Sequence, residues 1–298
     1  MDLEQTKKIV TVIVTYNGAE WIEKCLSSVT EAPVNNHEVL VIDNGSQDTT
    51  VALIKQHFPK VQLLLPGANL GFGKANNLGI EKALSAGADY IFLLNQDAWM
   101  NTNTFPELIR CMEKYPEFGI LSPIQLNADG NLDSQFRKYY KTESNTENQQ
   151  VDEIKFVNAS GWFMTAACIQ AVGGFSPLFF HYGEDADYCN RVRYHGFKIG
   201  VATKCSYIHD RGGRAAVALV AEKQTQQMFV ANLVRLANIN RGLWLNTSLN
   251  FWRMSMNRLE GKGRTQVVTQ AYAKSLKKLK EVVSHRKAAK QKGAFISY

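Results

Sequence analysis

The chain has 298 residues, of which 45% are hydrophobic and 20% charged, as in a globular protein with room for one sizeable domain and an appendage. No run of about eighteen apolar residues is present to span a bilayer. The N-terminus lacks the apolar core of a signal peptide, so we expect a cytosolic protein. The five cysteines never form a CxxC pair, which argues against a disulfide framework or a zinc site, and we expect buried thiols.

The formal charge of +7 is concentrated at the C-terminal end of the chain. From Lys262 onward there are ten Lys and Arg residues against one acid, Glu281, whereas the preceding part has 24 basic and 26 acidic residues. A nearly neutral body with a basic tail differs from the basic surface of a nucleic-acid binder. We therefore expect no nucleic-acid partner.

The first third of the chain alternates strand-like and helix-like segments. Its short β-branched and apolar runs fit strands that are buried on both faces of a parallel sheet. Strands that alternate with helices at short spacing predict a doubly wound α/β sheet, in which ligands bind beyond the carboxyl ends of the strands. The predicted strands are 9–14, 38–42, 61–65 and 90–94, and the predicted helices are 20–29, 49–57 and 76–86.

The rest of the chain contains a polar stretch, a second globular stretch and a helical end. Residues 127–155 are polar and poor in aliphatic side chains, so we expect a lid-like or mobile loop there. Globular composition returns over 156–208, and a helix is expected to begin at the acidic cluster within it. The end of the chain predicts a basic amphipathic helix. Its apolar positions, at helical spacing among lysines, are Tyr272, Leu276, Leu279 and Val283.

Asp97 is a candidate metal ligand. It follows the buried strand 90–94, which places its carboxylate at the ligand-binding edge of the sheet. Mg²⁺ and Mn²⁺ take oxygen ligands, and one or two carboxylates plus substrate phosphates are enough to hold them. The structural alternative for Asp97 is a helix or turn cap. His209 ends another β-like run and can also bind a divalent metal, although a lone His is more often a structural hydrogen-bonding residue.

Three further segments favour an anionic or nucleotide ligand. Asp43 ends a strand, where its carboxylate either bonds a base or ribose edge or closes an Asx turn. Residues 69–79 bring small residues and amides to a helix start, which suits an anion but also suits tight packing of a helix on a strand. Arg211 and Arg214 lie among glycines, where they either fold over phosphates or form a solvated turn.

The acidic cluster Glu184-Asp185-Ala186-Asp187 is the second candidate for chemistry. A carboxylate suits a general base that takes the proton of an attacking hydroxyl. We choose Asp185 as this base and Glu184 and Asp187 as neighbours that orient the hydroxyl-bearing substrate. The structural alternative is an acidic first turn that interacts favourably with the helix dipole.

In this order and spacing, these segments closely resemble the family-2 glycosyltransferases with the GT-A fold, particularly rhamnosyltransferase-like bacterial members. The resemblance covers roughly residues 8–215. The segments that carry it are 12–17, 41–46, 69–79, 93–97, 173–175, 181–187 and 208–209.

The resemblance implies an α/β fold with a mixed, mostly parallel sheet flanked by helices, and the sequence pattern beyond it predicts a helical C-terminal extension. On this basis we divide the chain into a catalytic domain, 1–225, and a basic helical extension, 226–298. Within the catalytic domain we expect a nucleotide-binding half over about 8–100 and an acceptor half over about 101–225.

The resemblance also implies an inverting, metal-dependent transfer of a sugar in cell-surface polysaccharide assembly. The donor would be a nucleotide-diphosphate sugar of the dTDP-rhamnose or UDP-hexose type, and the acceptor a carbohydrate or lipid-linked glycan. Asp185 would be the catalytic base, and Asp97 the last carboxylate of the metal-binding Asp-x-Asp. His209 would be a second metal or diphosphate contact, with Mg²⁺ or Mn²⁺ as the cofactor.

The resemblance also implies two sets of substrate contacts, one for the donor and one for the acceptor. Thr15, Tyr16 and Asp43 are expected to line the nucleoside pocket of the donor site. The sequence departs from the family pattern at Asn95-Gln96, where many relatives carry another Asp or a Pro. The complete expected donor set is Thr15, Tyr16, Asn17, Asp43, Asn69, Gly71, Gly73, Asn76, Asn95, Gln96, Arg211 and Arg214. The expected acceptor contacts are Trp162, Glu184 and Asp187.

Two other functional classes compete with sugar transfer. A non-catalytic sugar-nucleotide-binding subunit is favoured by Asn95-Gln96 and opposed by the presence of both Asp97 and Asp185. A nucleotidyltransferase would need a Gly-rich N-terminal signature with a basic residue, but residues 17–20 after the first strand lack it. For the basic extension we expect an anionic membrane surface, on the inner face of the plasma membrane, with a dimerisation helix as the alternative.

Overall fold

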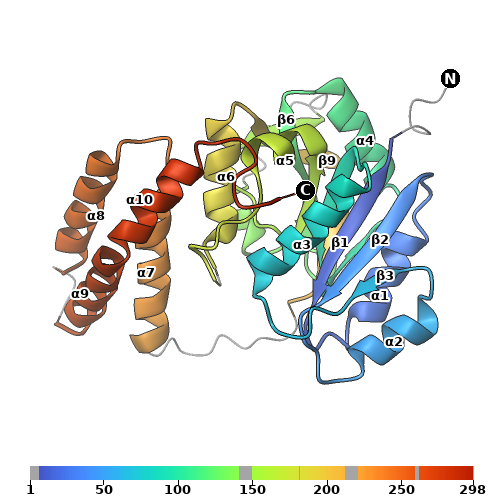
Figure 1. Ribbon diagram of the computed structural model, residues 1–298, viewed down its shortest axis with the longest axis horizontal. Helices are drawn as coiled ribbons and strands as arrows, with labels where there is room; N and C mark the ends of the chain where they lie inside the picture. The colour runs from blue at the N-terminus through green and yellow to red at the C-terminus, as the bar shows by residue number, and fades with distance from the viewer. Residues whose placement is uncertain (1–6, 141–149, 181, 212–220, 259–261, 298) are drawn as a thin grey trace.

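The computed structural model describes residues 7–140, 150–180, 182–211, 221–258 and 262–297. A mixed β-sheet lies at its centre with helices on both faces, and a bundle formed by α7 to α10 stands beside it (Figure 1). This is the mostly parallel, helix-flanked α/β sheet that the sequence predicts.

The N-terminal half supplies parallel strands in the order β3-β2-β1-β4. Apolar residues fill both faces of β1, β2 and β4, because helices cover the sheet on both sides. The order of the strands reverses between β1 and β4, which is where open α/β sheets bind ligands. The elements are β1 (Ile9–Thr15), α1 (Ile22–Thr30), β2 (His37–Asp43), α2 (Thr50–His57), β3 (Gln62–Leu64), α3 (Phe72–Ser85) and β4 (Tyr90–Asn95).

The second half extends the same sheet beyond β4. β8 pairs antiparallel with β4 and β6, β6 pairs parallel with β9, and β5 and β7 pair antiparallel with β9. Ala98 of β5 lies opposite His209 of β9, so two distant segments meet beside Asp97. The elements are β5 (Ala98–Met100), α4 (Thr104–Lys114), β6 (Phe118–Leu126), the 3₁₀ helix η2 (Phe136–Lys138), β7 (Val151–Ile154), β8 (Gly161–Thr165), α5 (Ala166–Val172), α6 (Glu184–Tyr194) and β9 (Lys198–His209).

The hydrophobic core has one layer on each face of the sheet. On one face, Phe105 of α4 packs edge-on against Phe92 of β4, with ring centroids 5.4 Å apart. On the other, Trp162 of β8 stacks on Phe175, with centroids 6.0 Å apart. All five cysteines are buried free thiols, as expected.

The C-terminal extension is helical, as the sequence predicts. It consists of α7 (Ala221–Ala237), α8 (Leu243–Arg258), α9 (Lys262–Lys277) and α10 (Leu279–Ala288), and the boundary that we placed at 225/226 falls within α7. After α10 the chain returns to the sheet domain, where Ala294 O accepts a hydrogen bond from Gly174 N at 2.8 Å. No helix among the described residues is long and apolar enough to cross a bilayer.

The expected single amphipathic helix through Tyr272 and Val283 is not formed. The chain breaks at Lys278 between α9 and α10, and Leu276 and Val283 are exposed. The bundle instead buries Ala271 and Val282, which lie one residue earlier on each helix. The spacing of the apolar residues did not reveal which residues are buried, because a break in the helix changes which of its faces packs against the bundle.

The expected polar loop 127–155 is only partly a loop. It contains η2 and β7, and two of its three aromatic residues, Phe136 and Tyr140, are buried. Sheet pairing of β7 with β9 overrides the polar composition here. The helix predicted at 76–86 begins earlier, at Phe72, directly after Gly71, which has a φ of 78°.

Candidate active site

A cavity of about 710 Å³ lies beyond the carboxyl ends of β1, β2 and β4. Its walls come from these strand ends, from the start of α3, from the segment before β8 and from the start of α6. The lining residues are Val14, Tyr16, Asn44, Asn69, Gly71, Phe72, Asn95, Gln96, Asp97, Gln135, Tyr139, Asn158, Ala159, Ser160, Phe180, Tyr182, Glu184, Asp185, His209 and Arg211.

Asp97 and His209 form a buried pair in this cavity. The pairing of β5 with β9 brings them together, and His209 Nε2 lies 3.2 Å from Asp97 Oδ1. On the other side of the ring, Gln125 Nε2 lies 2.7 Å from His209 Nδ1, while Gln125 Oε1 is buried with no hydrogen-bond donor among the described residues. No cluster of three His, Cys, Asp or Glu side chains suited to a metal occurs in the described part of the chain.

Glu184 and Asp185 enter the cavity from the first turn of α6. Gly183, with a φ of 91°, allows the tight turn that opens this helix. Burial raises the pKa of Asp185 to about 6. Burial and the neighbouring charge of Asp185 raise the pKa of Glu184 to about 7. Carboxylates with pKa values this close to neutrality are suited to accept and hold a proton.

Gln96 holds the turn after β1 in place. Its Oε1 accepts hydrogen bonds from Thr15 Oγ1 at 2.6 Å and Tyr16 N at 2.8 Å, and its Nε2 donates to Tyr16 O at 3.2 Å. A Cβ on Gly18 would lie 2.3 Å from Gln96 Oε1, so a larger residue there would displace the Gln96 amide. The residue at which the sequence departs from the family pattern therefore has a structural partner in this chain.

Asp43 adopts the Asx turn that was its structural alternative, and it also keeps one free oxygen. Its Oδ2 accepts from Gly45 N at 3.2 Å and Ser46 N at 3.0 Å. Its Oδ1 is buried and accepts no hydrogen bond from the described residues. The adjacent Asn44, which the sequence analysis missed, joins the wall by donating from Nδ2 to Asn69 Oδ1 at 3.0 Å.

The wall opposite the strand ends was also missed, because it comes from loops. Tyr139 donates its hydroxyl hydrogen bond to Asn158 Oδ1, and Asn158 Nδ2 donates to Ser160 Oγ at 2.9 Å. Phe180 and Tyr182 border the cavity and are 73% and 64% exposed. The two tyrosines and Phe180 carry no sequence pattern that separates them from core aromatics; only their exposure in the fold does so.

The cavity contains Tyr16, Asn69, Gly71, Asn95, Gln96 and Arg211 of the expected donor set. Arg211 is also tied to Asp133, with Nε 3.2 Å from Oδ2. Arg214 lies outside the described residues. The expected donor residues that do not line the cavity are Thr15, Asn17, Asp43, Gly73 and Asn76.

None of these five residues lines the cavity, and four of them hold or pack neighbouring segments. Thr15 binds Gln96, and Asn17 Oδ1 accepts from Gln47 N at 2.8 Å. Asn76 Nδ2 donates to Phe72 O at 2.9 Å within α3. Gly73 serves packing, since a Cβ there would lie 3.0 Å from Phe175 Cβ.

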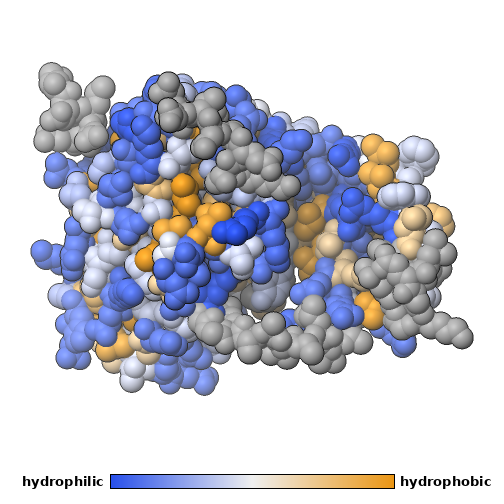
Figure 2. All heavy atoms as spheres, turned by 180° about the vertical axis from the view of Figure 1, so that it is seen from behind, coloured by the Kyte–Doolittle hydropathy of each residue, from blue (hydrophilic) through white to orange (hydrophobic). Residues whose placement is uncertain are grey.

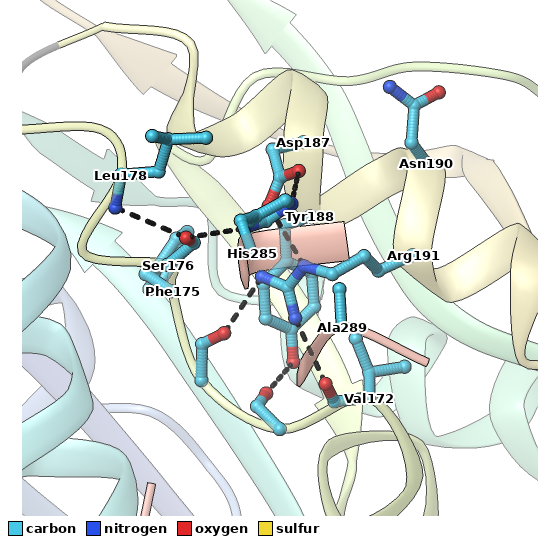
Figure 3. A network of polar contacts seen from close by, with 12 residues as sticks. Val172, Phe175, Ser176, Leu178, Asp187, Tyr188, Asn190, Arg191, His285 and Ala289 are labelled. Atoms are coloured by element: carbon cyan, nitrogen blue, oxygen red, sulfur yellow. Dashed lines mark hydrogen bonds and ion pairs between the residues drawn. The ribbon is translucent and has the colours of Figure 1, made fainter. Parts of the chain in front are cut away.

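Two expected acceptor contacts need correction. Trp162 is fully buried in the core layer and does not line the cavity. Asp187 is 1% exposed and does not line the cavity; it lies beside His285 and Arg191 (Figure 3). Its Oδ2 accepts from Arg191 Nε at 2.8 Å, and its Oδ1 lies 3.0 Å from His285 Nε2. Burial alone would raise the pKa of Asp187, but Arg191 and His285 outweigh it and lower the pKa.

The fold is shared with solved glycosyltransferases. The chain superposes on S. aureus TarS 1–349 in complex with UDP-GlcNAc with a TM-score of 0.59 at 15% identity, covering 94% of this chain and 92% of the other. It superposes on the mannosyltransferase PcManGT from Pyrobaculum calidifontis, in complex with GDP-Man and Mn²⁺, with a TM-score of 0.58 at 14% identity, covering 96% and 88%. The architecture is thus the expected GT-A fold.

Sequence comparison also points to glycosyltransferases. The chain is 26% identical to an N-acetylglucosaminyl-diphospho-decaprenol L-rhamnosyltransferase of Mycobacterium tuberculosis, over 76% of this chain and 85% of the relative. It is 25% identical to the dTDP-rhamnosyl transferase RfbF of Shigella flexneri, over 70% of each chain. The model of glycosyl transferase family 2 matches residues 10–167, more than half of the chain. The protein is therefore a glycosyltransferase and belongs to family 2.

Proposed function

We propose that the protein is an inverting, metal-dependent enzyme that moves a sugar from a nucleotide-diphosphate donor to a carbohydrate or lipid-linked glycan acceptor. One observation carries the proposal. A single cavity is lined both by Asp97 and His209, at the edge of the sheet, and by Asp185, at the start of α6. The first pair suits a diphosphate with its cation, and the second position suits a base for the acceptor hydroxyl.

The residues around His209 fit a divalent cation. Gln125 Oε1, which is buried without a hydrogen-bond donor among the described residues, belongs to the amide that lies against the His209 ring. Turning the Gln125 amide by 180° would let Gln125 Oε1 accept a hydrogen bond from His209 Nδ1–H, which satisfies the oxygen. His209 Nε2 would then be left as a ligand beside Asp97. Histidine nitrogen and carboxylate oxygen both bind Mn²⁺, and Asp97 and His209 would share the ion with the donor diphosphate. When bound, the ion would neutralise charge on the departing diphosphate.

Asp185 would act as the base in a single displacement. The acceptor oxygen forms a bond to the anomeric carbon while the bond from that carbon to the diphosphate oxygen breaks. The proton of the acceptor hydroxyl passes to Asp185, and the electron pair of the broken bond leaves with the nucleoside diphosphate. Because attack and departure occur on opposite faces of the sugar, the anomeric configuration inverts. Arg211, on the cavity wall, would add positive charge near the leaving group.

The nucleoside would be held at the ends of β1 and β2. Asp43 does not line the cavity, but its buried Oδ1 accepts no hydrogen bond from the described residues, and a base N–H or ribose hydroxyl that reached it would satisfy it. Tyr16, which is 45% exposed on the cavity wall, offers a ring on which a base could stack. Asn69 and Gly71 sit before α3, where backbone N–H groups favour phosphate.

The acceptor would enter past Phe180 and Tyr182, whose exposed rings provide apolar contact area for a sugar face. The names of the two rhamnosyltransferase relatives favour a dTDP-rhamnose donor over a UDP-hexose, and that of the mycobacterial relative favours an acceptor on a lipid diphosphate. Such a reaction would belong to cell-surface polysaccharide assembly. The basic C-terminal extension is consistent with an acceptor presented at an anionic membrane surface.

The test is product analysis with a panel of dTDP-, UDP- and GDP-sugars, Mn²⁺ or Mg²⁺, and glycan acceptors. The proposal expects release of nucleoside diphosphate from one donor, loss of release with EDTA, and a product whose anomeric configuration is inverted by NMR. Retention of configuration, or full activity in EDTA, would contradict the mechanism. Donor binding without turnover under every acceptor would instead favour a sugar-nucleotide-binding subunit.

A further inference from the structure

Helix α8 turns polar side chains inward and large apolar side chains outward. Asn246 and Asn250 are buried against the bundle, where each side-chain amide donates to a backbone carbonyl of the preceding segment, at 2.9 and 3.1 Å. Trp244 and Trp252, in contrast, are 81% and 59% exposed. Buried polar groups and exposed large apolar groups are the two departures from ordinary packing that call for an explanation. Here both occur on one helix.

The exposed apolar residues share one face of α8. Positions 244, 245, 251, 252 and 256 recur at helical spacing and lie on the side opposite Asn246 and Asn250. Single exposed apolar residues are common on soluble proteins, but a contiguous group marks an interaction surface. We call this group the α8 aromatic face. It consists of Trp244, Leu245, Phe251, Trp252 and Met256, which are 44% to 81% exposed.

The C-terminal segment that carries this face is strongly positive. Residues 241–298 contain thirteen Lys and Arg residues and two acids, and α8 itself contains no Asp or Glu. Arg241, just before the helix, and Arg253, on the helix, are both exposed. An apolar face with basic neighbours fits a partner that is apolar inside and anionic at its surface.

The α8 aromatic face is separate from the active site. None of its residues lines the active-site cavity, and α8 lies at the end of the molecule away from β3 (Figure 1). Seen from behind, that end shows hydrophobic side chains in orange among hydrophilic ones in blue (Figure 2). A ligand there would leave the cavity open.

We propose that the α8 aromatic face docks the protein on an anionic lipid bilayer. Trp244 and Trp252 would lie at the headgroup level, where an indole can place its ring in apolar surroundings and its N–H in water. Arg241 and Arg253 would contact lipid phosphates. A second copy of the chain is a poorer occupant, because a two-fold contact would bring these basic surroundings face to face. The inference deepens the proposed function and rests on it for its purpose, since docking brings the enzyme to a lipid-linked acceptor.

The test is sedimentation of the full-length protein with phosphatidylcholine vesicles, with and without phosphatidylglycerol. We expect binding to the anionic vesicles and a blue shift of tryptophan emission. The double variant Trp244→Ser/Trp252→Ser should lose both effects, with affinity reduced at least about tenfold. Trp21, Trp99 and Trp162 remain in the double variant and report that its fold is intact. Arg241→Gln/Arg253→Gln should weaken binding only to the anionic vesicles.

The control is Leu65→Ser, which removes an apolar side chain that is 52% exposed on the sheet domain; it should bind vesicles like the unaltered protein. Equal binding by the unaltered protein and the double tryptophan variant would overturn the proposal. So would the absence of vesicle binding, or a dimer in light scattering that the double variant dissociates.

Nucleoside diphosphate release with a water-soluble acceptor is measured in parallel. If vesicle binding is present and release is absent, the docking surface stands and the proposed function fails.

Discussion

Asp97 and Asp185 lie in one cavity although they are far apart in the sequence. Their surroundings differ and suit the two carboxylates to different roles. Asp97 sits at the edge of the sheet with Oδ1 3.2 Å from His209 Nε2, where the two side chains would share the proposed divalent cation. Asp185 is a carboxylate whose pKa burial raises to about 6. The same residue type is therefore suited to a metal ligand in one place and to a proton acceptor in the other.

The pH dependence of turnover follows from this difference. A base works in its deprotonated form, so kcat/KM should fall about tenfold per pH unit below a pKa of about 6 and level off above it. The measurement is kcat/KM between pH 5 and 8 at saturating metal. Glu184→Gln is the control and should keep this acidic limb. A limb that disappears in Glu184→Gln would move the role of base from Asp185 to Glu184.

Gln125 should act on the metal through His209. Replacing it by Leu removes the amide beside Nδ1 and leaves the ring orientation unsupported, and loss of such a partner typically lowers metal affinity about 10–100-fold. Gln125→Glu keeps an acceptor for Nδ1–H and should retain most of the affinity. Titration of Mn²⁺ followed by electron paramagnetic resonance, in the presence of nucleoside diphosphate, measures the difference. Equal affinities of Gln125→Leu and the unaltered protein would exclude this role for Gln125.

At the scale of elements, α6 joins the active site to the rest of the molecule. Its first turn carries Asp185 into the cavity, and its next residues turn Asp187 and Arg191 into the interior. Arg191 is fully buried; its Nη1 donates to Val172 O at 2.9 Å and its Nη2 to Gly174 O at 2.8 Å (Figure 3). The helix that positions the proposed base is thus fixed by an ion pair on its opposite face.

Breaking this pair should destabilise the fold. Arg191→Met leaves Asp187 buried with only His285 beside it, and removing one partner of a buried pair costs about 3–5 kcal/mol. Arg193→Met, two residues along the same helix and partly exposed, is the matched control and should cost less than about 1 kcal/mol. Urea denaturation measures both. A loss for Arg191→Met no larger than that for Arg193→Met would contradict this account of the buried pair.

Site residues at the ends of strands could be predicted from the sequence better than site residues on loops. Asp97 and Asp43 could be placed because each follows a strand with an unmistakable apolar run, and parallel strands bring such ends together. Tyr139 and Asn158 could not, because they lie on irregular segments whose course depends on long-range packing. Asp187 looked like a substrate contact because it is next to Asp185, but helical geometry turns neighbouring residues to different faces.

At the scale of the whole molecule, the C-terminal extension and the sheet domain share one interior. His285 of α10 lies 2.8 Å from Ser176 Oγ through Nδ1 and stacks on Phe295 with ring planes 4° apart. Asn77 of α3 donates to Phe295 O at 3.3 Å. His285 Nε2 also lies 3.0 Å from Asp187 Oδ1, so the extension packs against α6, the helix that carries the proposed base.

This packing predicts a single unfolding transition for the extension and the sheet domain. His285→Ala should lower the Tm of that transition by about 5 °C or more, because it removes one partner of Asp187 and a stacked ring. Val283→Ala, on the exposed side of the same helix, should leave the Tm nearly unchanged. Differential scanning calorimetry distinguishes the cases. Two separate transitions in the unaltered protein would show that the units are not coupled.

The most direct test of the central claim separates donor binding from turnover in Asp97→Ala and Asp185→Asn. With the donor that the unaltered protein uses, we predict that Asp185→Asn binds the donor with nearly unchanged affinity and loses about 10²–10⁴-fold in nucleoside diphosphate release. Asp97→Ala should lose both metal-dependent donor binding and release. Near-normal release by Asp185→Asn, or metal-dependent donor binding that survives in Asp97→Ala, would contradict the roles assigned to the two carboxylates.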